Sequence, residues 1–175
     1  MSCVFAKLSV EELLDLEDEI RSDLDEEHVK GGSIDKIIRV YEELHKKIRR
    51  DKNSEYFESL PTIENRLIAY LVEYGTYLKT VYQKDDIAAE GSLQKALKYK
   101  KYLPIVHYRL GFLYYRKRAY TSALNHFQNA LQYQKYGEET KYRMNQQQLY
   151  NCHLYLANCG LFIAKEANEP LEELE

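Results

Sequence analysis

Residues 104–134 decide the fold, and they read PIVHYRLGFLYYRKRAYTSALNHFQNALQYQ. Apolar residues return every three or four positions on both sides of residues 117–119, a spacing that predicts two helices joined by a short turn. Gly111 and Ala123 are small, so the two helices can approach each other closely. Tyr114 and Phe127 can then fill the space around the contact. The stretch predicts an antiparallel helix pair.

The spacing of these residues resembles that of a tetratricopeptide repeat, a helix pair with a period of about 34 residues. The family pattern is Trp-x2-Leu-Gly-x2-Tyr followed by Ala-x3-Phe. This chain has six of the seven main marks, Leu110, Gly111, Tyr114, Ala123, Phe127 and Ala130, and His107 stands in place of the tryptophan. The resemblance implies an all-α array of antiparallel helix pairs that winds into a right-handed superhelix.

Two weaker copies flank this repeat. The upstream copy covers residues 67–100 and contains Gly75, Ala89 and Ala96. Ala96 lies 34 residues before Ala130, which is the family period. A partial copy over residues 150–170 contains Gly160 in a long helix with no second helix after it. Because repeat arrays normally end in a solvated capping helix, we expect either a larger protein of which this is the N-terminal part, or a last helix that is itself the cap.

The same apolar spacing predicts helices in most of the remaining chain. Ser9 and Glu12 have the capping-box spacing, so a first helix should begin there, and we expect Gly31-Gly32 to end it. Further helices are predicted from Ser33 to about residue 52 and over residues 62–83, 87–100, 104–117, 120–134 and 140–167. We therefore expect an N-terminal helical hairpin and connector over residues 1–60 and a repeat array with a long C-terminal helix over residues 62–175.

The composition supports a folded protein without a membrane span. Hydrophobic residues make up 45% of the chain and the net charge is -3, values that exclude a disordered chain. The longest nearly uncharged stretch, residues 149–164, is shorter than the roughly 20 apolar residues that a spanning helix needs. The N-terminus shows no secretory signal. We expect a cytoplasmic protein with no membrane partner.

No motif of an enzyme or a cofactor site is present. The seven glycines form no phosphate-binding loop, and the five histidines are scattered through the chain. Cys152 and Cys159 lie about 10 Å apart along one predicted helix, which is too far for a disulfide, and we expect them to pack in a helix interface. The sequence therefore predicts no catalytic residue, no metal ion and no cofactor.

The family resemblance implies a binding role, because tetratricopeptide arrays bind peptides or proteins on a concave face lined by the first helix of each repeat. At the corresponding positions this chain would present Ile105, Tyr108, Arg109, Phe112, Tyr115 and Arg116 from one repeat and Ala69, Val72, Thr76 and Lys79 from the other. Aromatic residues and arginines dominate the binding energy of many interfaces. The alternative is that Tyr108 and Phe112 pack against the neighbouring repeat.

Charge is distributed unevenly along the chain. Residues 91–150 hold 11 bases and 2 acids, whereas residues 1–90 hold 13 bases and 21 acids. The basic block favours an acidic partner, either an acidic peptide or, less favoured without a reader motif, a nucleic acid. The sequence is also compatible with a peptide-sensing regulatory receptor that signals through its N-terminal helices, and with a homodimer that forms through the apolar face of the last helix.

Overall fold

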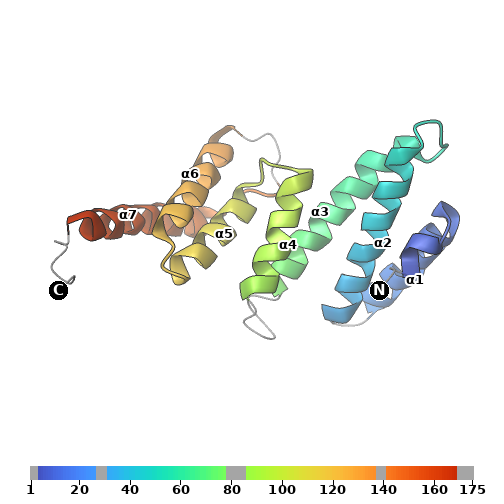
Figure 1. The fold of residues 1–175 in the computed structure, drawn as a ribbon, viewed down its shortest axis with the longest axis horizontal. Helices are drawn as coiled ribbons and strands as arrows, with labels where there is room; N and C mark the ends of the chain where they lie inside the picture. The colour runs from blue at the N-terminus through green and yellow to red at the C-terminus, as the bar shows by residue number, and fades with distance from the viewer. Residues whose placement is uncertain (1–3, 27–30, 78–85, 137–140, 169–175) are drawn as a thin grey trace, which may run out of the picture. The chain divides into compact units, whose positions relative to one another are not determined.

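The computed structural model describes residues 4–26, 31–77, 86–136 and 141–168. These residues form seven α-helices and two short 3-10 helices and contain no strand, so the all-α fold class is confirmed (Figure 1). Within residues 10–99, and again within residues 104–168, each helix packs beside the next in chain order, as the short links between them predicted.

The packing divides the chain into two units, Met1–Tyr99 and Lys100–Glu175. Unit 1 contains η1 (Val4–Lys7), α1 (Val10–Glu26), α2 (Gly31–Arg50), η2 (Phe57–Ser59), α3 (Leu60–Tyr77) and α4 (Asp86–Tyr99). Unit 2 contains α5 (Pro104–Arg116), α6 (Tyr120–Tyr136) and α7 (Gln146–Asn168). The expected division at residues 60–62 and the superhelix stay predictions.

The start of α1 follows the sequence signal, and the start of α2 does not. The Ser9 amide donates to the Glu12 carboxylate at 2.7 Å, and the Glu12 amide donates to the Ser9 hydroxyl at 3.1 Å, so the capping box is confirmed. The expectation that Gly31-Gly32 end the first helix is wrong, because α1 ends at Glu26 and α2 begins at Gly31. Burial of Ile34 and Ile37 in the first turns of α2 supports a helix that starts this early.

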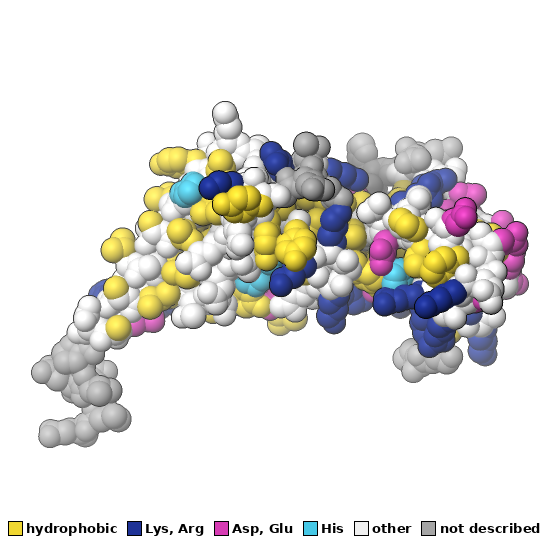
Figure 2. Space-filling model, turned by 90° about the horizontal axis from the view of Figure 1, so that it is seen from above, with side chains coloured by type: hydrophobic (Ala, Val, Ile, Leu, Met, Phe, Trp, Pro, Cys, Tyr) yellow, Lys and Arg dark blue, Asp and Glu magenta, His cyan; other side chains and the backbone are white. Residues whose placement is uncertain are grey.

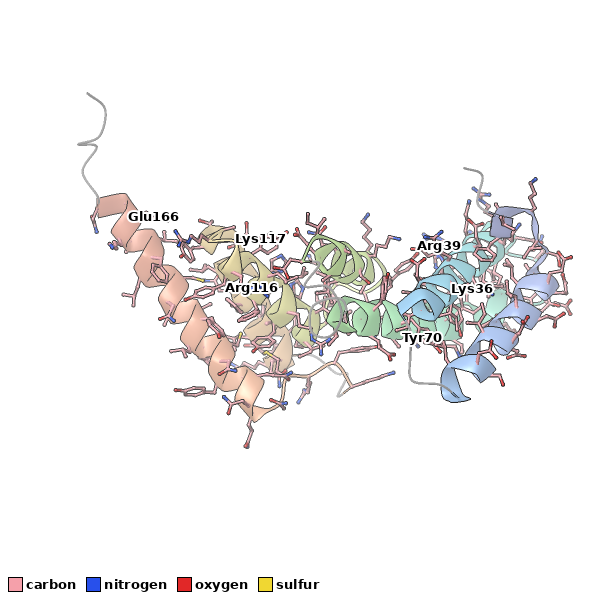
Figure 3. The ribbon with its side chains drawn as sticks, turned by 90° about the horizontal axis from the view of Figure 1, so that it is seen from below. Lys36, Arg39, Tyr70, Arg116, Lys117 and Glu166 are labelled. Atoms are coloured by element: carbon pink, nitrogen blue, oxygen red, sulfur yellow. The ribbon has the colours of Figure 1, made fainter. Side chains whose placement is uncertain are left out.

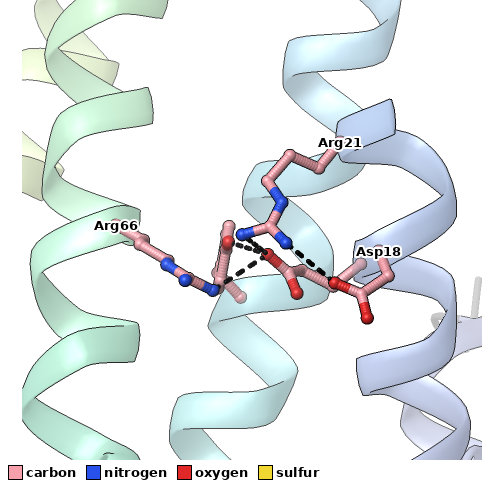
Figure 4. Close-up of polar contacts among 5 residues, drawn as sticks. Asp18, Arg21 and Arg66 are labelled. Carbon is pink, nitrogen blue, oxygen red and sulfur yellow. Dashed lines mark hydrogen bonds and ion pairs between the residues drawn. The ribbon is translucent and has the colours of Figure 1, made fainter. Parts of the chain in front are cut away.

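A buried carboxylate joins the first three long helices of unit 1. Glu17 of α1 is only 3% exposed. Its carboxylate accepts a hydrogen bond from the Tyr41 hydroxyl of α2 and lies 3.2 Å from a guanidinium nitrogen of Arg66 of α3 (Figure 4). Arg21 lies 3.6 Å from the same oxygen and also pairs with Asp18. A buried charge is retained only with such partners, so this network fixes how α1, α2 and α3 are aligned.

We predict that Glu17→Gln destabilises the protein by about 2 kcal/mol, because the amide keeps the shape of the carboxylate but loses its charged hydrogen bonds. Urea unfolding followed by circular dichroism measures the change. Glu19→Gln, an exposed site on the same helix, is the matched control and should shift stability by less than about 0.5 kcal/mol. Equal effects of the two substitutions would show that the network does not stabilise unit 1.

Two glycines allow close helix approaches inside the units. A Cβ atom on Gly111 of α5 would lie 2.8 Å from the ring of Phe127 of α6, and one on Gly75 of α3 would lie 2.7 Å from the side chain of Leu93 of α4. Phe127 and Leu93 are fully buried, so neither can move aside easily. Each pair is therefore packed around a position that tolerates no side chain.

Gly111→Ala should destabilise unit 2 by at least about 1 kcal/mol, because the added methyl group overpacks a buried ring. Gly91→Ala is the comparison, since a Cβ atom on this exposed helical glycine would have nothing within 4 Å. That substitution should stabilise α4 by about 0.5 to 1 kcal/mol. Chemical unfolding of both variants measures the difference, and a stabilising Gly111→Ala would contradict the packing argument.

The last helix begins six residues later than predicted, at Gln146 and not at residue 140. The side chain of Gln134 forms hydrogen bonds with both backbone groups of Met144, in the irregular segment before α7. It accepts from the Met144 amide at 2.8 Å and donates to the Met144 carbonyl at 3.1 Å. Asn145 and Gln148 then form a reciprocal capping box, with bonds of 2.9 and 2.8 Å. These contacts end the irregular segment and start α7.

Candidate protein-binding surface of unit 2

Five of the seven residues predicted to bind a partner lie on one face of α5. Tyr108, Arg109, Phe112 and Tyr115 are half-buried on this face, and Arg116 is exposed at its end. We call these five residues the α5 face. The remaining two residues do not join it: Thr76 belongs to α3 of unit 1, where its hydroxyl donates to the Val72 carbonyl at 2.7 Å, and Lys79 lies outside the described residues.

Two further residues expected on the concave face are buried. Ile105 is 7% exposed and Val72 is 8% exposed, so neither is presented to a partner. The Ile105 amide donates to the Tyr142 carbonyl at 3.0 Å, which ties the first turn of α5 to the segment before α7. The repeat pattern missed this burial because that segment lies outside the helix pair.

The aromatic rings of the α5 face contact α7. Phe112 lies 5.3 Å from Tyr155 between ring centroids, and Tyr115 lies 4.9 Å from Tyr155 and 6.3 Å from Phe162. Phe162 also stacks on Tyr120 at 4.6 Å. The alternative expectation is that Tyr108 and Phe112 pack against the neighbouring repeat. Phe112 contacts Tyr155 and Tyr108 is hydrogen-bonded to Asn151, both on α7, so part of each side chain packs inside unit 2. Tyr120, Tyr155 and Phe162 were not predicted as site residues.

Phe127 forms the buried base under these rings. It is fully buried, stacks on Tyr155 at 5.8 Å and lies 6.3 Å from Tyr108. We call the half-exposed rings above it the aromatic cluster, which consists of Tyr108, Phe112, Tyr115, Tyr120, Tyr155 and Phe162. The cluster is held in place by three helices, so its rings lose little freedom when a partner binds.

Positive charge lies beside the aromatic cluster. Burial lowers the pKa of the Arg109 guanidinium, and burial raises the pKa of the neighbouring Tyr108 hydroxyl. Arg116 at the end of α5 and Lys117 and Arg118 in the turn after it are all exposed. Figure 3 shows Arg116 and Lys117 at the end of α5, with Glu166 on the last turns of α7.

Arg118 has a backbone conformation that favours glycine. Its φ is 59°, and it lies two residues after Arg116, the last residue of α5. Two hydrogen bonds close this helix end: the Arg118 amide donates to the Tyr115 carbonyl, and the Ala119 amide donates to the Tyr114 carbonyl. Glycine usually occupies this left-handed position, because a Cβ atom costs about 1 kcal/mol there. The chain therefore keeps a third base at this turn at a cost in stability.

Two histidines share a hydrogen bond that joins α5 to α6. The Nε2 atom of the buried His107 lies 3.0 Å from the Lys101 carbonyl, which only accepts, so this nitrogen carries a proton. The Nδ1 atom of His107 lies 3.0 Å from Nδ1 of His126, so His126 donates this bond when His107 is neutral. Burial lowers the pKa of His107; the hydrogen bond to the Lys101 carbonyl partly opposes this shift, and the charge of Lys101 adds to it. Tyr114 stacks on His126, and Tyr133 lies against His107.

We predict that this pair makes unit 2 less stable in acid. Because the pKa of His107 is lower in the folded than in the unfolded state, the unfolded chain binds more protons as the pH falls through about 6.5, and the free energy of unfolding decreases. Urea unfolding at pH 7.5 and pH 5.5 measures the loss. In His107→Leu the loss should be smaller, although this variant is less stable at pH 7.5. The same pH dependence in both proteins would exclude His107 as its source.

The two cysteines of α7 are buried inside unit 2. Cys152 and Cys159 are both fully buried free thiols, and the Cys152 thiol points to the Phe127 carbonyl at 3.6 Å. Burial raises the pKa of Cys152 to about 12, so the thiol stays protonated at neutral pH. The expected packing role is confirmed. Among the described residues, no three His, Cys, Asp or Glu side chains are grouped closely enough to hold a metal ion.

Comparison with known proteins assigns no family to the chain. No protein-family model matches the sequence, and no curated protein matches it significantly. The resemblance to tetratricopeptide repeats therefore stays a prediction based on the residues quoted above. Within the described part of the chain, every helix is too short or too polar to cross a membrane.

Proposed function

We propose that the protein is a non-catalytic interaction module whose unit 2 binds an acidic peptide or protein segment on the α5 face and the aromatic cluster. The observation that carries this proposal is the placement of half-exposed aromatic rings from three helices beside Arg109 and Arg116. Tyrosine, phenylalanine and arginine are enriched at protein interfaces because they combine a large contact area with directed polar groups. The expected cytoplasmic location is part of the same proposal.

The charge of unit 2 supports an acidic partner. Arg116, Lys117 and Arg118 are exposed at one turn, and Arg118 is kept in a conformation that glycine would adopt at lower cost. Backbone strain is often retained where the strained residue takes part in binding, so the left-handed Arg118 supports a binding role for its side chain. A carboxylate-rich segment would be attracted to this turn and held by charged hydrogen bonds to the guanidinium groups.

A peptide is favoured over a nucleic acid by the packing of the rings. Non-specific binding of single strands needs aromatic faces that are open to successive bases. In the aromatic cluster Phe162 stacks on Tyr120, and Tyr155 stacks on Phe127. The partly exposed rings are thus engaged with one another and form a continuous apolar surface, which suits the side chains of a peptide.

The proposal predicts that peptides selected by display on the purified protein are enriched in Asp and Glu next to an apolar residue. Titration calorimetry with a selected peptide should show that Arg116→Glu weakens binding about tenfold or more, because it reverses a charge that faces the ligand. Lys36→Glu, the same reversal on an exposed position of α2 in unit 1 (Figure 3), is the matched control and should leave affinity unchanged.

Arg118→Gly separates binding from stability in the same experiment. It should raise the free energy of unfolding by about 1 kcal/mol, because it relieves the left-handed residue, and yet weaken peptide binding. Tyr108→Ala should weaken binding without loss of helical signal. The proposed site would be refuted if the selected peptides lacked acidic residues, or if neither Arg116→Glu nor Tyr108→Ala changed the affinity for the peptide.

A further inference from the structure

The outward face of α7 carries an apolar seam that no described part of the chain covers. Tyr150 is 64% exposed, Leu154 is 45% exposed and Leu161 is 70% exposed. With the exposed Ala157 and Ala164 they follow one another at alternating steps of four and three residues. This is the heptad spacing of helices that pack along one another. Figure 2 shows hydrophobic side chains along the left-hand edge of unit 2, where α7 lies in Figure 1.

Gly160 lies beside this seam and faces open space. A Cβ atom on it would have nothing within 4 Å, whereas Cβ atoms on Gly75 and Gly111 would collide with large side chains of the paired helices. Gly91 in α4 faces open space as well, and a glycine inside a helix costs about 0.5 to 1 kcal/mol relative to alanine. Beside the seam, however, the missing side chain leaves room for a large side chain of another helix. The seam and the glycine together form a seat for a helix with large apolar side chains.

We infer that the helix seated there is α7 of a second copy of this chain, antiparallel to the first, with the two-fold axis at Ala157. In this register Leu154 of each copy lies against Gly160 of the other, and Tyr150 lies against Ala164. Leu154 and Tyr150 each meet a small residue, Leu161 lies against His153, and at the axis Ala157 meets Ala157. A surface that matches its own two-fold image in this way fits a second copy, because every contact is made twice.

Charge agrees with the same register. Residues 146–164 contain no Asp, Glu, Lys or Arg, so pairing two copies brings no like charges of these residues together in the seam. Exposed Lys141 and Arg143 precede α7, whereas exposed Lys165 and Glu166 lie together near its end and residues 165–175 of the sequence hold one base and five acids. An antiparallel arrangement places the basic end of one copy at the acidic end of the other, whereas a parallel arrangement would place like charges together.

The dimer is independent of the proposed peptide site. Tyr155 and Phe162 contact α5 and α6, and the seam lies on the other side of α7. Both copies therefore keep the α5 face available, and loss of peptide binding and loss of dimerisation are separate results.

Sedimentation equilibrium of the full chain tests the pairing. The wild-type mass should rise from one copy to two over roughly 1 to 100 μM, because a seam of this length forms a small interface. Leu154→Glu and Leu161→Glu should remain monomeric at about 100 μM and keep their helical signal. Ile87→Glu, at an apolar position of α4 that is 80% exposed, is the matched control and should dimerise like the wild type.

Cysteine pairs test the direction and the register. In a Cys3→Ser background, a mixture of Tyr150→Cys and Ala164→Cys proteins should form a mixed disulfide under mild oxidation more readily than either protein forms one with itself. A monomer at all concentrations would overturn the inference and leave the seam to another protein. Preferential Tyr150→Cys homodisulfides would overturn the antiparallel arrangement, and dimerisation of Leu154→Glu as strong as that of the wild type would exclude the seam.

Discussion

Unit 2 depends on the contact between Gly111 and the ring of Phe127. A Cβ atom at residue 111 would lie 2.8 Å from this ring, so α5 and α6 reach their spacing only because no side chain is present there. The same ring stacks on Tyr155 of α7, and the Phe127 carbonyl accepts a hydrogen bond from the Cys152 thiol. One buried residue therefore sets the spacing of the helix pair and the seat of α7, and the geometry of the aromatic cluster follows from both.

The sequence was informative where a contact joins residues close together in the chain. Gly111 and Phe127 lie on two helices joined by one short link, and their sizes and spacing predict the antiparallel helix pair. Tyr155 and Phe162 were missed because their contacts with α5 depend on how α7 crosses the pair, and no local spacing encodes that crossing. The start of α7 was missed for a similar reason, since Gln134 on another helix satisfies the segment before it.

In unit 1, the sequence likewise does not show which distant residues contact each other, here for a buried charge. Glu17 lies four residues after Leu13 and three before Ile20, on the apolar stripe of α1, and this position is the only sequence signal of its burial. Its partners Tyr41 and Arg66 come from α2 and α3, at separations of 24 and 49 residues. A local pattern can show that a carboxylate lies on the buried face of a helix. Only the packed helices show which groups form the hydrogen bonds and ion pairs that stabilise its buried charge.

The two faces of α7 indicate what this helix does in the folded protein. A capping helix presents a polar outer face to solvent, whereas α7 exposes Leu154 and Leu161 along a stretch without Asp, Glu, Lys or Arg. Pairing through that face would cover it and bring two α5 faces into one assembly. A partner with two acidic segments would then bind the second site at a raised local concentration, so modest affinity at each site would suffice for stable capture. Under the two proposals, the apolar seam and the α5 face would be parts of one binding arrangement.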